Sequence, residues 1–123
     1  GLDLTHQALA TPEVEAEIKA LNTPVSEFVV GLFGFFRKAY QTNQGFDNPP
    51  VHDPCTIAYL IDSDIVQTRK APVHVELAGA LTTGMTVTDL REPADASCHT
   101  QVATTLDHAG FWRLVTDALK NLA

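Results

Sequence analysis

The sequence lacks several features that would place it in well-defined classes of protein. It has only two cysteines, Cys55 and Cys98, and their wide separation indicates neither a disulfide framework nor a closely spaced zinc motif. Its longest apolar run, residues 28–36, is too short to cross a bilayer as a helix. We therefore expect a soluble, cytoplasmic protein with reduced thiols and no membrane partner.

Positive charge is also scarce. Eight Lys and Arg residues stand against 15 Asp and Glu residues, which gives a formal net charge of −7, and the longest basic cluster is the pair Arg69 and Lys70. A protein of this charge repels the phosphate backbone, so we expect no nucleic-acid partner. The length of 123 residues and the 45% hydrophobic content fit one globular domain over residues 1–123.

The sequence does contain three clear helix starts. A threonine or an aspartate precedes a proline at Thr11-Pro12, Thr23-Pro24 and Asp53-Pro54, an arrangement that favours a helix N-terminus. The helical spacing of the apolar residues that follow predicts helices over residues 12–21, 24–42 and 54–61. The helix over 24–42 carries a wide apolar surface, which we expect to stay partly uncovered and to promote self-association.

After residue 70 the period of the apolar residues changes from helical to alternating. Residues 73–77 and 85–89 flank a glycine-containing turn and predict a hairpin, and residues 99–107 predict a third strand. Asp107 is placed to cap a last helix whose shared apolar face consists of Phe111, Leu114, Val115, Ala118 and Leu122. The first residues, 1–5, have the pattern of the end of a strand. The expected order is therefore three helices, a small strand group and a C-terminal helix.

The stretch "PPVHDPC", residues 49–55, places His52 and Asp53 between prolines. Spacing alone favours the interpretation that Asp53 caps the following helix and that His52 is an ordinary loop histidine. The functional alternative makes Asp53 an oxygen ligand for Ca²⁺ or Mg²⁺, with His52 beside it as a proton donor. Tyr40 ends an aromatic stripe upstream and could fold over the same cavity. The residues alone leave both interpretations open.

Four stretches, taken in order, resemble one known family. They are "GLDLTHQALATPEV", "PPVHDPCTIAYLID", "VHVELAGALTTGMTVTDL" and "DHAGFWRLVTDAL", and they are similar to the C-terminal part of the inosine-uridine preferring nucleoside hydrolases. The most specific motif is HDPC, and TxGMTV supports it. The resemblance implies an α/β, Rossmann-like fold and an enzyme of nucleoside salvage that hydrolyses ribonucleosides to ribose and nucleobase. It also implies a homo-oligomer for the complete enzyme.

The resemblance implies roles for four residues. His52 matches the general acid that protonates the leaving nucleobase, and Asp53 matches an aspartate that completes the shell of an active-site Ca²⁺. Tyr40, and more weakly Phe36, match aromatic positions on a helix over the base. In this interpretation the neighbouring prolines restrict the backbone so that His52 and Asp53 can hold different partners.

The sequence departs from the family at one important point. The family's aspartate-rich motif, DxDxxxDD, supplies most calcium ligands and the base that activates water, and it does not occur among these residues. We therefore expect the chain to correspond to the C-terminal part of a single nucleoside hydrolase domain and to be inactive alone. The alternative hypothesis is a standalone, non-catalytic binding or assembly module. The catalytic identities of His52, Asp53 and Tyr40 favour the enzyme for the parent protein.

Overall fold

The three helices predicted from their proline starts are present in the computed structural model, which describes residues 1–122. They are α2 (Pro12–Lys19), α3 (Pro24–Asn43) and α4 (Pro54–Ile61). Thr11 caps α2 by accepting a hydrogen bond from the Val14 N–H. Thr23 accepts from the Ser26 N–H while its own N–H donates to Ser26 Oγ, which forms a reciprocal cap on α3. These threonine caps fix where α2 and α3 begin.

The first residues form a helical turn, α1 (Leu2–Thr5), so the expected strand end is wrong. The N–H groups of Leu4 and Thr5 both donate to the carbonyl of Gly1, and the Leu4 side chain is buried in the core. Two leucines separated by one residue are too short a pattern to distinguish a strand from a turn of helix.

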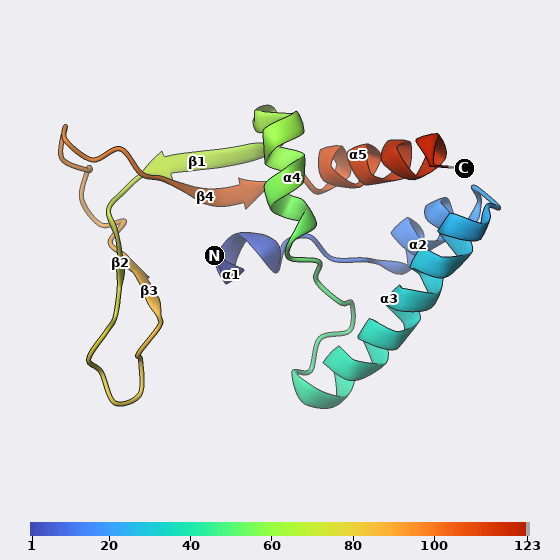
Figure 1. Ribbon diagram of the computed structural model, residues 1–123, viewed down its shortest axis with the longest axis horizontal. Helices are drawn as coiled ribbons and strands as arrows, with labels where there is room; N and C mark the ends of the chain where they lie inside the picture. The colour runs from blue at the N-terminus through green and yellow to red at the C-terminus, as the bar shows by residue number, and fades with distance from the viewer. Residues whose placement is uncertain (123) are drawn as a thin grey trace.

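The strands form two separate antiparallel pairs. In one, β2 (Val73–Val75) and β3 (Thr86–Thr88) make the predicted hairpin, which projects away from the helices (Figure 1). The predicted third strand, β4 (Gln101–Leu106), does not extend that hairpin and pairs with β1 (Val66–Lys70) instead. Sequence patterning missed β1 because only Val66 of its five residues is buried, which leaves no alternation to detect.

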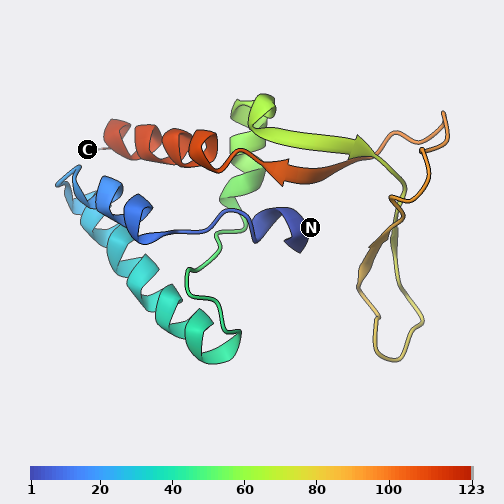
Figure 2. The ribbon, with the colours of Figure 1, turned by 180° about the vertical axis from the view of Figure 1, so that it is seen from behind.

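The core lies around α5 (His108–Asn121), which packs against both α2 and α4. As predicted, Asp107 caps α5, because its side chain accepts from the Gly110 N–H. Phe111 is fully buried and Trp112 nearly so, and α5 runs beside α2 in both views (Figures 1 and 2). Leu122, expected on the buried face, is exposed, and Leu119 is buried instead.

The apolar surface of α3 is largely uncovered, as expected from the sequence. Phe33 packs into the core, but Phe28 and Phe35 are 66% and 70% exposed. The second half of α3 extends away from the other helices toward the loop before α4 (Figure 1). Although α3 has 20 residues, no helix among residues 1–122 is long and apolar enough to cross a membrane.

Candidate functional site

A pocket of about 380 Å³ lies between the second half of α3 and the loop that leads into α4. One wall comes from α3 and consists of Leu32, Phe33, Phe36 and Tyr40. The other comes from the loop and the start of α4, residues 49–54. All four residues predicted as a site line this pocket: Phe36, Tyr40, His52 and Asp53. The structure therefore gathers in one place residues that the sequence placed on two separate elements.

His52 is held by a hydroxyl group at each of its ring nitrogens. Tyr40 Oη lies 2.8 Å from Nε2, and Thr5 Oγ1 lies 2.8 Å from Nδ1. A hydroxyl both donates and accepts hydrogen bonds, so this pair of contacts can serve the neutral and the protonated ring. The sequence placed Tyr40 near the same cavity but did not predict this contact with His52. The Thr5 contact was missed, because no local pattern connects two residues that lie 47 positions apart.

The backbone before His52 is fixed by the N-terminal segment that follows α1. The N–H of Ala10 donates to the Pro49 carbonyl at 2.9 Å, and the N–H of Val51 donates to the Ala8 carbonyl at 3.0 Å. The two prolines of this loop have no N–H to donate, so Val51 is its first available donor. His52 follows directly after this paired segment, which places its side chain beside Thr5.

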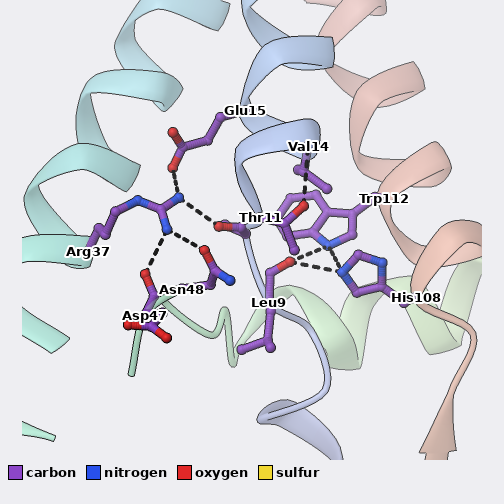
Figure 3. A network of polar contacts seen from close by, with 10 residues as sticks. Leu9, Thr11, Val14, Glu15, Arg37, Asp47, Asn48, His108 and Trp112 are labelled. Atoms are coloured by element: carbon purple, nitrogen blue, oxygen red, sulfur yellow. Dashed lines mark hydrogen bonds and ion pairs between the residues drawn. The ribbon is translucent and has the colours of Figure 1, made fainter. Parts of the chain in front are cut away.

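The same segment is tied to α5 from the other side. The indole Nε1 of Trp112 donates to the Leu9 carbonyl at 3.0 Å, and His108 Nε2 lies 2.9 Å from the same oxygen (Figure 3). Trp112 itself is buried in the core. Residues 8–10, which support His52, are thus hydrogen-bonded both to the pocket loop and to α5.

Asp53 occupies the position before α4, as the helix-cap interpretation requires, but its side chain does not cap the helix. Its backbone already has helical dihedrals, φ −62° and ψ −39°, and its side chain makes no capping hydrogen bond. A capping residue normally has extended dihedrals, which turn its side chain back toward the first N–H groups of the helix. The Asp53 carboxylate therefore remains available at the exposed edge of the pocket, beside His52.

A cluster of rings that includes Tyr40, Phe46 and His6 lies beside His52. Phe36 and Tyr40 lie one helical turn apart and share a face. Phe46 packs edge-on against Tyr40 and His6, with ring centroids 6.0 Å and 4.9 Å apart, and the His6 ring lies 5.8 Å from that of His52. Phe46 was missed by sequence analysis, because a single aromatic residue in a loop carries no periodicity.

Cys55, the last residue of the HDPC motif, belongs to the core rather than to the pocket. It is 2% exposed, and its thiol donates to the Val51 carbonyl at 3.4 Å. Burial raises the pKa of the Cys55 thiol, which keeps it protonated and a poor nucleophile. Its role in the motif is to pack the start of α4.

Arg37 connects the elements on which the pocket is built. It lies one turn before Tyr40 on α3 and donates to the carbonyls of Ala10 at 2.9 Å and Asp47 at 2.8 Å (Figure 3). It also donates to the Asn48 side chain and forms an ion pair with Glu15 of α2. The Arg37 and Glu15 side chains are 20% and 22% exposed, so the network is shielded from much of the solvent.

We expect Arg37→Ala to destabilise the chain by about 2–4 kcal/mol, because several partly buried acceptors and one carboxylate lose their partner. Arg37→Lys keeps the charge but not the planar fork, so it should recover only part of the loss. Urea unfolding followed by circular dichroism measures the free energy. Lys38→Ala is the matched control at an exposed neighbour. A loss at Arg37 no larger than that at Lys38 would contradict this role.

The described residues do not form a calcium shell by themselves. Residues 1–122 contain no group of three or more His, Cys, Asp or Glu side chains that could hold a metal ion. Asp53 offers one carboxylate, whereas Ca²⁺ takes six to eight oxygen ligands. A calcium ion at this pocket would therefore need ligands from outside these residues.

Comparison with known proteins gives consistent results. The family model described as "Inosine-uridine preferring nucleoside hydrolase" matches residues 1–113. The chain is 48% identical over 122 residues to an inosine-uridine preferring nucleoside hydrolase of Crithidia fasciculata, covering 99% of this chain and 39% of that protein. It is 38% identical over 121 residues to a pyrimidine-specific ribonucleoside hydrolase of Shigella boydii, covering 98% of this chain and 39% of that one.

Solved structures agree with this result. A purine-preferring ribonucleoside hydrolase from Gardnerella vaginalis superposes with a TM-score of 0.79 at 28% identity, covering 98% of this chain and 40% of the other. A plant nucleoside hydrolase shares the fold with a TM-score of 0.78 at 20% identity, with the same coverage. These likenesses confirm the predicted fold class. The chain spans about 40% of the length of the proteins it matches.

Proposed function

This chain belongs to the inosine-uridine preferring nucleoside hydrolase family, and from that premise we propose that it takes part in hydrolysing the N-glycosidic bond of ribonucleosides. The observation that carries the proposal is the position of His52. Its ring is held between two hydroxyls at the wall of an apolar pocket, next to a carboxylate that has no capping role. The relatives are named for inosine and uridine, for pyrimidines and for purines, so the proposal covers ribonucleosides as a class.

In the proposed reaction His52 acts as the general acid. Water and nucleoside give ribose and nucleobase, and the base nitrogen gains electron density as its bond to C1′ breaks. A proton delivered to the leaving base at that moment stabilises the transition state. Such catalysis typically contributes 10²–10⁴-fold, or about 3–5 kcal/mol. The proton would leave Nε2, which faces Tyr40 at the pocket, and would reach the base through the Tyr40 hydroxyl.

The remaining pocket residues would bind the base. Flat nucleobases pack well against aromatic and aliphatic side chains, and the pocket offers Phe36 and Tyr40 together with Leu32 and Phe33. Phe36 is 46% exposed, so its ring is accessible to a ligand. We assign Tyr40 and Phe36 to contact with the base.

Asp53 is proposed as one ligand of a calcium ion. Its carboxylate is released from capping and lies at the pocket edge. When bound, calcium would orient the ribose hydroxyls and make a bound water more acidic. Because the described residues supply too few ligands, we propose that the chain alone is inactive and that catalysis requires further ligands from outside it.

A chimera tests this function directly. Residues 1–123 would replace the matching segment of the Crithidia fasciculata relative, with which they share 48% identity. We expect the chimera to hydrolyse inosine or uridine in a spectrophotometric assay, while the isolated chain does not. A folded chimera that binds nucleoside but has no hydrolytic activity would favour the non-catalytic binding module instead.

A further inference from the structure

The contact between Thr5 and His52 raises the question of which ring nitrogen carries the proton. A neutral imidazole has one N–H and one acceptor nitrogen, and an imidazolium has two N–H groups. If His52 gives its proton from Nε2, as the proposed function requires, the ring must afterwards keep its remaining proton on Nδ1. Thr5 Oγ1, 2.8 Å from Nδ1, is the group in contact with that nitrogen.

We propose that Thr5 is a positioning residue that keeps the proton of neutral His52 on Nδ1, an inference that rests on the proposed acid role of His52. The Thr5 oxygen accepts from Nδ1–H both before and after proton transfer. Tyr40 Oη accepts from Nε2–H in the imidazolium and donates to Nε2 in the neutral ring. The proton that leaves Nε2 passes to Tyr40 Oη as the Tyr40 hydroxyl gives its own proton to the departing base, and the ring does not rotate between the two states.

The chemistry of the two hydroxyls favours a neutral ring with its proton on Nδ1 over one with its proton on Nε2. A phenol is more acidic than an aliphatic alcohol, so a tyrosine O–H is the stronger hydrogen-bond donor of the two. Tyr40 Oη lies at Nε2 and Thr5 Oγ1 at Nδ1, each at 2.8 Å. The arrangement in which Tyr40 donates to Nε2 and Thr5 accepts from Nδ1–H therefore has the lower free energy.

The fold holds Thr5 firmly enough for this task. Thr5 is partly buried at the end of α1, next to buried Leu4. Two residues later, the Gln7 side chain donates to the Thr104 carbonyl and accepts from the Leu106 N–H, both at 2.9 Å, which anchors the segment to β4. The branched side chain of threonine also restricts its χ1 rotation. The hydroxyl is thus presented to Nδ1 by a fixed backbone and a stiff side chain.

The tautomer can be measured on the ¹⁵N-labelled chain itself, without substrate or metal. Two-bond ¹⁵N–¹H spectra, recorded at a pH about two units above the ordinary pKa of imidazole, show which ring nitrogen carries the proton. His52 is assigned by the loss of its signals in His52→Gln. We expect wild-type His52 to be predominantly Nδ1–H. Thr5→Val, which replaces the hydroxyl by a methyl group, should shift it to predominantly Nε2–H.

Two further variants separate the hydrogen bond from general disturbance. Thr5→Ser keeps the hydroxyl and should keep the Nδ1–H form, and Thr42→Val, at an exposed threonine of α3, should leave His52 unchanged. A predominantly Nε2–H ring in the wild type overturns the proposal even if Thr5→Val does not fold. An Nδ1–H ring that is unaffected by Thr5→Val overturns it as well. Because no activity is measured, failure here is distinct from failure of the proposed function.

Discussion

Replacing His52 by alanine in the chimera is expected to slow the hydrolysis of inosine and uridine by roughly 10²–10⁴-fold. A riboside whose leaving group departs as a stable anion, such as a nitrophenolate, should lose little activity. The reason is that a general acid matters only where the departing atom needs a proton. The measurement is kcat/KM for both substrates in the same variant, and the expected result is a large difference between the two losses.

The comparison separates an acid from a structural histidine. If His52 only supported the pocket, its loss would displace Asp53 and impair both substrates to the same degree, so equal losses would refute the acid role. His6→Ala provides a matched control, because the His6 ring packs within the same aromatic group, 5.8 Å from His52. That variant should affect the two substrates alike.

Much of the pocket was predictable because its determinants are local. The threonine and proline residues at the helix starts fixed where α3 begins, and helical spacing placed Phe36 and Tyr40 on one face. The prolines beside His52 indicated a constrained loop entering α4. The loop brings His52 back to the end of α3, where Tyr40 contacts it; the sequence had placed Tyr40 near this cavity without predicting the contact.

The features that were missed depend on distant contacts or on backbone angles. Thr5 meets His52 only because residues 8–10 pair with residues 49–51, and β4 meets β1 rather than the hairpin. Neither pairing leaves a local pattern. The Asp53-Pro54 pair looks the same whether or not the aspartate caps its helix, and the helical dihedrals of Asp53 decide that it does not.

Asp53→Ala in the chimera should lower kcat/KM for both kinds of substrate together, by on the order of 10²-fold or more, because a metal ion contributes several kcal/mol to such a transition state. It should also raise the calcium concentration needed for half-maximal activity. Asp53→Asn retains one neutral oxygen, so its activity should lie between that of the wild type and that of Asp53→Ala. In the isolated chain, calorimetry should show no tight calcium binding, because Asp53 alone supplies too few ligands.

Stability measurements distinguish the loss of activity in Asp53→Ala from damage to α4. The Asp53 side chain makes no capping bond, so Asp53→Ala should change the free energy of unfolding of the chain by less than about 0.5 kcal/mol. Asp107 does cap its helix, through the Gly110 N–H at 3.0 Å, and Asp107→Ala should cost about 1 kcal/mol. Full activity of Asp53→Ala at low calcium would remove Asp53 from the metal site. A stability loss as large as that of Asp107→Ala would instead restore its role as a helix cap.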